Sequence, residues 1–197
     1  QYTASFENTK SLVFDGTTAS MTMPDVTSGT EYKPTASASV FAWVKLPDWN
    51  VTPIQTFFST FRSGGGYLMQ YDNKRLKTTI RIGSSTKQVS GGYNKLRIGG
   101  TQGTSNGWHH VGFTFDGQYI TQYVDGVADA QASSNPIDLG SAGNTINYGT
   151  IFQGLHVGVR YGTTVEMLNG THDDMAVWSN ALTAAEVLAI YNSGTVT

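Results

Sequence analysis

The stretch GWHHVGFTFDGQYITQYVDG, Gly107 to Gly126, alternates apolar and polar residues and contains two Asp-Gly pairs. Alternation with a period of two places every second side chain on the same face of a β-strand. Asp-Gly pairs are common in tight turns, because glycine adopts positive φ without a clash and aspartate tolerates it. We therefore predict an antiparallel ladder from Trp108 to about Ala130, with turns at Asp116-Gly117 and Asp125-Gly126.

Two adjacent histidines, His109 and His110, raise the question of a metal or catalytic site, since imidazole binds metals and acts as a general base. Successive side chains of a strand point to opposite faces, so this pair cannot reach one ion. His156 and His172 lie far along the chain, and no H-x-H or H-x-x-x-H spacing occurs. We expect one of the pair to face the core with its ring nitrogens hydrogen-bonded to backbone.

Short β-branched and aromatic runs, separated by Gly, Ser, Asn and Asp, continue along most of the chain and are typical of an antiparallel β-sandwich. The other predicted strands are Ser11–Asp15, Ser20–Pro24, Ala38–Leu46, Ile54–Phe61, Tyr67–Tyr71, Leu76–Ile82, Phe152–Val159 and Asp174–Ser179. Because there is no fixed-period repeat and no shift in composition, we expect one domain over residues 1–197.

Only the C-terminal stretch SNALTAAEVLAIYNSG, Ser179 to Gly194, has a helical period. Thr183 and Glu186 have the spacing of a capping box, in which each side chain bonds the other residue's backbone N–H. The apolar residues between Val187 and Tyr191 supply one buried flank. We predict one short helix docked on an all-β body.

Composition argues against several classes of function. The chain has 12 Lys+Arg, 14 Asp+Glu and a net charge of -2, so it lacks the basic character of a nucleic-acid binder. Its densest basic stretch, Asn73 to Arg81, alternates with apolar residues and predicts a strand with one solvated face. No apolar run approaches the ~18 residues of a membrane span. The absence of cysteine excludes disulfides and cysteine nucleophiles.

Three segments together resemble the concanavalin A-like, laminin G-like jelly-roll family: SLVFDGTTASMTMPD from Ser11, WHHVGFTFDGQYITQYVDG from Trp108, and LNGTHDDMAVWSNALTAAEVLAIYNSG from Leu168. They follow the family's order and span nearly the whole chain. The resemblance implies a two-sheet antiparallel jelly roll whose first and last strands lie close together. It also implies a non-catalytic binding or adhesion module of the kind found on secreted bacterial proteins and phage virions.

The resemblance also raises the possibility of an enzyme, because some jelly-roll proteins of this architecture are glucanases. A retaining glycosidase needs two carboxylates about 5 Å apart, which those enzymes carry on one strand as E-x-D-x-x-E. The glutamates of this chain, Glu7, Glu31, Glu166 and Glu186, assemble no such pattern. No G-x-S-x-G nucleophile elbow occurs either. We therefore expect no enzymatic activity.

Structural calcium is common in relatives, and the carboxylates that match the family's terminal motifs are Asp15, Asp173 and Asp174. Calcium takes about six to eight oxygen ligands from carboxylates and carbonyls. If the first and last strands adjoin, these three carboxylates would approach one another. The alternative is that Asp15 and Asp174 cap turns or accept hydrogen bonds from backbone amides.

Sugars bind to aromatic faces flanked by planar polar groups. Four aromatic residues in predicted loops, each beside Asn, Asp or Arg, are candidates for such a site: Trp49, Tyr93, Tyr148 and Tyr161. The alternative for each is packing against the protein body or another chain. Three tryptophans within apolar alternation are expected in the core: Trp43, Trp108 and Trp178.

The sequence thus favours a recognition module that binds carbohydrate at a cell surface or on a polymer. The alternative is a structural or decoration domain of a phage virion, in which the same aromatic residues would contact other virion proteins. Both hypotheses place the protein outside the cell or on a virion surface.

Overall fold

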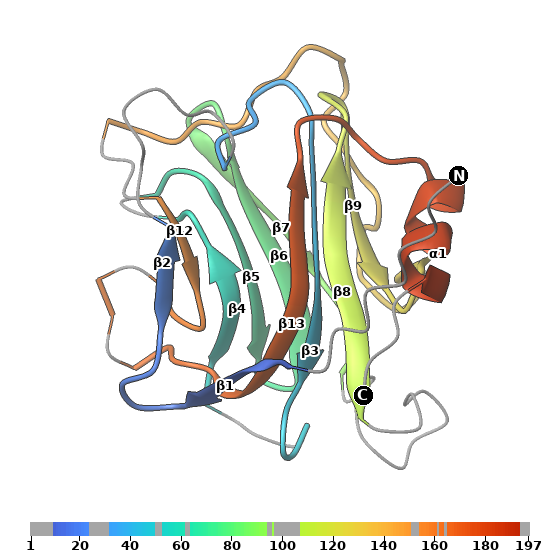
Figure 1. The fold of residues 1–197 in the computed structure, drawn as a ribbon. Helices are drawn as coiled ribbons and strands as arrows, with labels where there is room; N and C mark the ends of the chain where they lie inside the picture. The colour runs from blue at the N-terminus through green and yellow to red at the C-terminus, as the bar shows by residue number, and fades with distance from the viewer. Residues whose placement is uncertain are drawn as a thin grey trace, which may run out of the picture.

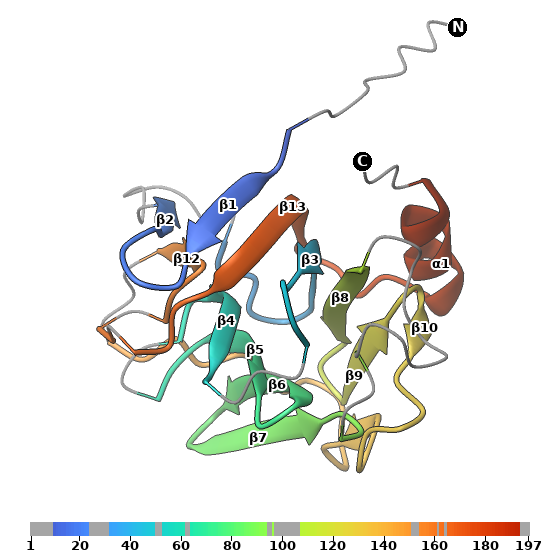
Figure 2. The same cartoon turned by 90° about the horizontal axis from the view of Figure 1, so that it is seen from below.

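Two antiparallel β-sheets pack face to face, and one helix lies outside the larger sheet (Figure 1 and Figure 2). The computed structural model describes residues 10–23, 32–49, 53–61, 64–93, 96, 107–150, 154–160, 162–163 and 165–193. This arrangement confirms the predicted all-β sandwich with one short C-terminal helix. The described part of the chain contains no helix that is long and apolar enough to cross a membrane.

The larger sheet has seven strands, and its edge strand β1 pairs with β13, the last strand of the chain. Its path runs β1 (Leu12–Asp15), β13 (Asn169–Trp178), β3 (Ala38–Lys45), β8 (Trp108–Phe115), β9 (Tyr119–Val124) and β10 (Val127–Ala128), and β11 (Ile137–Asp138) also pairs with β9. The expected proximity of the first and last strands is therefore confirmed.

The smaller sheet has six strands and forms the other layer of the sandwich (Figure 2). Its order is β2 (Met21–Met23), β12 (Leu155–Val157), β4 (Gln55–Ser59), β5 (Tyr67–Asp72), β6 (Arg75–Ile82) and β7 (Ser85–Ser90). Tyr67 and Tyr71 of β5 face the space between the sheets and are fully buried.

Side chains of β3 and β8 alternate between the two faces of the larger sheet, because the two strands pair residue for residue. Val40 and Phe113 are opposite one another in this register and belong to the core between the sheets. Phe41 and His110 point to the other face of the sheet, where Phe41 belongs to a second apolar cluster. Each strand therefore contributes to two separate layers of packing.

The helix α1 (Ala184–Ser193) covers part of this second face (Figure 1). Val187 is fully buried there against Phe41 and Tyr123. Gly112 makes room for Phe41, since a Cβ at this glycine would lie 2.1 Å from Cδ1 of the ring. Trp178, expected in the core, is only partly buried at the margin of this cluster.

The helix begins with the predicted capping box. The backbone N–H of Thr183 donates to Glu186 Oε2 at 2.8 Å, and the backbone N–H of Glu186 donates to Thr183 Oγ1 at 3.3 Å. The Thr183 backbone and hydroxyl bonds lower the pKa of the Glu186 carboxyl. The capping prediction made from the spacing of these two residues is confirmed.

The two adjacent histidines point to opposite faces of β8, as expected. His109 lies between the sheets, where its ring meets Trp49 edge to face with centroids 4.9 Å apart. His110 lies on the helix side and stacks on Phe41 with centroids 5.1 Å apart. The expected backbone partner is wrong, however, because Nδ1 of His109 lies 2.8 Å from Oδ2 of Asp125.

Asp125 joins this core histidine to the turn between β9 and β10. It has a φ of +50° and is followed by Gly126 with a φ of +80°. These values are typical of a two-residue type I′ turn, which confirms the predicted Asp-Gly hairpin. Oδ1 of Asp125 also accepts a hydrogen bond from the backbone N–H of His110 at 3.0 Å. The turn and the histidine pair are therefore one hydrogen-bonded unit.

The sequence did not predict β7, and it predicted that β13 begins later than it does. β7 was missed because STKQVS is mostly polar, as suits an edge strand with one solvated face. β13 begins at Asn169 rather than Asp174, because the polar residues NGTHD pair with β1 and β3. A register shift between Asp173 and Ala176 divides this strand. The pairing partners, rather than any apolar alternation, make these segments extended.

Substitutions at Asp125 are expected to separate its two roles. Asp125→Ala removes both acceptors and strains a residue with positive φ, so we expect a loss of about 2 kcal/mol in the free energy of unfolding. Asp125→Asn tolerates positive φ and keeps one acceptor, so its loss should be smaller. Urea unfolding of both variants would measure the difference. An alanine variant as stable as the wild type would contradict this role.

The buried histidines predict a loss of stability in mild acid. Burial lowers the pKa of His110 to about 4, although nearby Asp125 and Asp174 oppose this shift, and burial also lowers the pKa of His172 to about 4. The unfolded histidines, with a pKa of about 6.5, bind more protons between these values. The free energy of unfolding should therefore fall between pH 7 and pH 4, by on the order of 2–3 kcal/mol per histidine.

Chemical unfolding at pH 7, 6 and 5 would measure this slope above the range in which most carboxylates titrate. His110→Gln and His172→Gln should each reduce the slope, whatever they do to stability at pH 7. Equal slopes in the wild type and both variants would show that these histidines do not control the pH dependence.

Candidate functional site

The three carboxylates expected to bind calcium do not converge. Asp15 on β1 lies opposite Asn169, four residues before Asp173 on β13. At about 3.3 Å per residue, this separation along the strand is roughly 13 Å. Within the described ranges, no three His, Cys, Asp or Glu residues group to hold a metal ion. The expected approach of Asp15 to Asp173 and Asp174 is therefore wrong, and calcium binding itself stays a prediction.

Asp15 instead closes the turn after β1. Its Oδ1 accepts hydrogen bonds from the backbone N–H groups of Thr17, Thr18 and Ala19 at 2.8 to 2.9 Å. These donors, Ala19 foremost, hold the pKa of the carboxyl well below its ordinary value. The structure therefore has the alternative expected for Asp15, in which its carboxylate accepts hydrogen bonds from backbone amides.

Asp173 and Asp174 lie at the register shift of β13. Asp174 has a φ of +43°, and its backbone N–H donates to Oδ1 of Asp173 at 2.9 Å. Asp174 lies near His110 and favours its protonated form. This pair therefore acts on the helix side of the larger sheet, away from the turn that Asp15 closes.

Two of the four candidate aromatic residues are buried. Trp49 is only 1% exposed, and its indole N–H donates to the carbonyl of Gly107 at 3.2 Å. Tyr148 is 5% exposed, and its hydroxyl donates to the carbonyl of Pro34 at 2.8 Å. Burial raises the pKa of this tyrosine. The prediction that these two residues present their rings to a ligand is wrong, because the loops that carry them fold into the core.

The other two candidates differ. Tyr93 is 46% exposed and lies beyond the end of β7, on the smaller sheet. Tyr161 lies outside the described residues.

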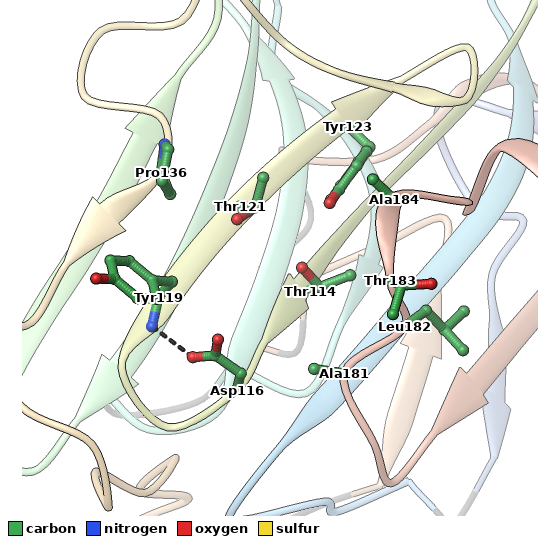
Figure 3. A pocket seen from close by; sticks show the side chains of 10 residues that line it. All are labelled: Thr114, Asp116, Tyr119, Thr121, Tyr123, Pro136, Ala181, Leu182, Thr183 and Ala184. Atoms are coloured by element: carbon green, nitrogen blue, oxygen red, sulfur yellow. Dashed lines mark hydrogen bonds between the residues drawn. The ribbon is translucent and has the colours of Figure 1, made fainter. Parts of the chain in front are cut away.

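A groove of about 470 Å³ lies on the outer face of the larger sheet, beside the beginning of α1 (Figure 3). One wall is formed by side chains of β8 and β9, and the other by the segment 181–184, which leads into the helix. The groove is lined by Thr114, Asp116, Tyr119, Thr121, Tyr123, Pro136, Ala181, Leu182, Thr183 and Ala184.

The alternation of side chains along β9 determines which residues form the first wall of the groove. Tyr119, Thr121 and Tyr123 are two residues apart and share the outer face, whereas Ile120 faces the core. Thr114 on β8 is directly opposite Thr121, which puts two hydroxyls side by side. Neither threonine hydroxyl has a hydrogen-bond partner among the described residues. The groove therefore combines the exposed ring of Tyr119 with two threonine hydroxyls, whereas the Tyr123 ring is mostly buried under the helix.

Asp116 holds one end of the groove in shape. Its Oδ1 accepts a hydrogen bond from the backbone N–H of Tyr119 at 2.6 Å (Figure 3). It accepts another from the backbone N–H of Gln118 at 2.8 Å. The side-chain amide of Gln118 donates to the hydroxyl of Tyr119 at 3.1 Å and to Asp138 at 3.2 Å. These bonds fix the turn that carries Tyr119, which is itself 38% exposed.

One feature of the sequence bears on this groove, the alternation within YITQYVD, Tyr119 to Asp125. Tyr119 and Tyr123 were not among the predicted ligand-binding residues, because they lie in a predicted strand and the candidates were aromatic residues of loops. In YITQYVD the tyrosines share a face with Thr121, and the opposite face carries Ile120, Gln122 and Val124. Because each face includes a polar residue, the alternation shows that Tyr119 and Tyr123 share one face but does not show which face is the outer one.

Solved structures with a similar fold include toxin binding domains. The binding domain of botulinum neurotoxin serotype G is 14% identical, with a TM-score of 0.63 over 91% of this chain and 41% of that chain. A structure of neurotoxin type C, which depends on two ganglioside molecules to enter cells, is 13% identical, with a TM-score of 0.56 over 80% and 36%. A serotype DC binding domain in complex with rat synaptotagmin II is 15% identical, with a TM-score of 0.52 over 80% and 36%.

This chain spans about two fifths of the length of these neighbours. At such low identity, the likeness shows a shared fold alone. A comparison with curated protein sequences finds no match.

A family model described as the concanavalin A-like lectin/glucanases superfamily matches residues 15–188. This range runs from the turn after β1 to the middle of α1, and so includes both sheets and the groove. The chain belongs to the concanavalin A-like lectin/glucanases superfamily.

Proposed function

We propose that this chain is a non-catalytic carbohydrate-binding module that holds its ligand in the groove between β9 and the beginning of α1. The observation that carries this proposal is that the exposed ring of Tyr119 shares one groove with the hydroxyls of Thr114 and Thr121, which have no hydrogen-bond partner among the described residues. Sugars need such a combination, because their C–H faces pack on aromatic rings while their hydroxyls exchange hydrogen bonds.

The residues of the groove favour binding over hydrolysis. A glycosidase of either stereochemistry places two carboxyl groups across the scissile bond. Asp116 is the one acidic residue in the groove lining, and its Oδ1 already accepts two backbone hydrogen bonds. Among the described residues that line the groove, Asp116 therefore has no second carboxyl group with which to form an acid–base pair.

The relatives support a recognition role of this kind. The fold is shared with toxin binding domains, one of which belongs to a neurotoxin that depends on gangliosides, and gangliosides carry sugars. Binding to glycans of a cell surface or an extracellular polymer would place this protein outside the cell or on a virion.

The alternative is a structural or decoration domain on a phage virion, in contact with other proteins. Two exposed apolar residues on the edge strand β1, Leu12 at 46% and Val13 at 76%, favour a protein contact. Mass spectrometry of purified virions would test this alternative. Detection of the chain as a stoichiometric component would support it, and glycan binding at the groove would remain a separate question.

The groove proposal predicts which variants lose affinity for neutral glycans. A glycan array would identify the best neutral oligosaccharide, and calorimetric titration would then measure its Kd. Tyr119→Ala should raise this Kd at least about tenfold, which corresponds to ~1.4 kcal/mol, because it removes an exposed ring without opening the core. Thr121→Val and Tyr123→Phe should each raise it severalfold, since they remove hydroxyls and preserve shape.

Tyr93→Ala is the matched control, because it removes another exposed tyrosine from the other sheet. Its affinity for the neutral ligand should equal that of the wild type. No binding to any neutral glycan, or an unchanged Kd in Tyr119→Ala, would overturn the proposal.

A further inference from the structure

A group of two basic residues and one tyrosine lies at the tip of the β5–β6 hairpin, on the smaller sheet. It consists of Lys74, Arg75 and Tyr93, and we name it the basic corner. Asn73 and Lys74 have φ values of +47° and +60° and form the two-residue turn between β5 and β6. Tyr93 follows β7, which pairs with β6, so the register brings it to this turn.

Both cations of the basic corner lie against the tyrosine ring. Lys74 Nζ is 5.8 Å from the ring centroid of Tyr93, and Arg75 Cζ is 5.4 Å from it. Cations at this distance are attracted to the ring face. The Arg75 guanidinium also donates to the carbonyl of Gly91 at 3.0 Å, which fixes its position. The cluster is therefore a formed arrangement rather than three independent surface side chains.

Among the described residues, neither cation of the basic corner forms an ion pair with a carboxylate. The nearest carboxylate in the hairpin, Asp72, forms an ion pair with Lys77. Lys74 and Arg75 have no carboxylate partner in the part of the chain that the structure describes, and both are only partly exposed. Partly buried charges are screened by salt less than fully exposed ones, so they attract an anion more strongly. Tyr93, 46% exposed, remains accessible beside them.

We propose that the basic corner binds an acidic sugar residue of a polysaccharide. Its carboxylate or sulfate group pairs with Lys74 and Arg75, and its ring contacts the exposed part of Tyr93. Arginine forms two parallel hydrogen bonds to such planar or tetrahedral anions. The exposed aromatic ring favours a sugar over an isolated anion, because it offers apolar contact in addition to charge.

A nucleic acid fits this surface less well. The chain has a net charge of -2, and the basic corner contributes two cations rather than a long basic track. The site lies on the smaller sheet and shares no residue with the groove at β9. The two sites can therefore bind different sugars, and either can fail without the other.

The test compares three polymers in titrations with the full chain: polygalacturonate with carboxylates, dextran sulfate with sulfates, and neutral dextran. We expect the wild type to bind at least one acidic polymer, more weakly at higher salt because the ion pairs are screened. The acidic polymer that binds identifies the preferred anion. Failure to bind both acidic polymers would overturn the proposal.

Single variants locate the binding site. Lys74→Gln and Arg75→Gln should each raise the Kd for the acidic polymer about tenfold, the effect expected for losing one charged hydrogen-bond donor. Tyr93→Ala should weaken binding, and Tyr93→Phe should preserve it, because the ring rather than the hydroxyl makes the contact. Thermal melting would confirm that each variant is folded, and unchanged Kd values in folded Lys74→Gln and Arg75→Gln would overturn the proposal.

Lys87→Gln is the matched charge control. Lys87 on β7 is opposite Ile80, which lies five residues along β6 from Arg75, so at about 3.3 Å per residue it is roughly 16 Å from the basic corner. This variant should bind the acidic polymer as the wild type does. An equal loss in Lys87→Gln and Lys74→Gln would show unspecific attraction and overturn the proposal. Tyr119→Ala should also leave this affinity unchanged, which separates the basic corner from the groove.

Discussion

The alternation of side chains along β8 is the constraint on which the other layers depend. This strand pairs residue for residue with β3 and continues in register with β9. Val111, Phe113 and Phe115 fill the space between the sheets. His110, Gly112 and Thr114 face the other side, where they provide a stacking surface, room for the Phe41 ring and a hydroxyl of the groove. A shift of one residue in the pairing register of β8 would exchange these two sets. It would disrupt both the core and the surface on which the helix packs.

The helix covers part of the outer face of the larger sheet, and the segment before it forms a groove with the remaining part. Val187 anchors it on Phe41 and Tyr123, and the capping box fixes where it begins. The segment that leads into the helix therefore lies beside β9 and forms the second wall of the groove. The basic corner depends on a different element, the two-residue turn between β5 and β6. This turn places Lys74 and Arg75 beside Tyr93, which follows β7. The two candidate sites thus depend on different elements and use different chemistry.

The sequence predicted the helix with its cap, the Asp125-Gly126 turn and the opposite orientations of the two histidines, because each depends on contacts within a few residues. It predicted the sandwich from the period-two alternation of many short strands and from the family resemblance. It failed where pairing with a distant strand decides the conformation, as in β7 and the first half of β13. It also failed for Trp49 and Tyr148, since a loop position predicts exposure only if the loop stays on the surface. The predicted approach of Asp15 to Asp173 and Asp174 was wrong because the adjacency of two strands does not determine their register. Asp15 is opposite Asn169 rather than Asp173.

GWHHVGFTFDGQYITQYVDG by itself determined a tight antiparallel ladder and the separation of His109 from His110, because backbone geometry and side-chain periodicity are local properties. Only the tertiary structure decided that Asp125 would pair with Nδ1 of His109, that Tyr119 and Tyr123 would form one wall of a groove, and that Lys74 and Arg75 would lie against Tyr93. These arrangements bring together residues from different strands and turns. Their positions follow from sheet register and helix docking, which depend on packing across the whole sandwich rather than on any single segment.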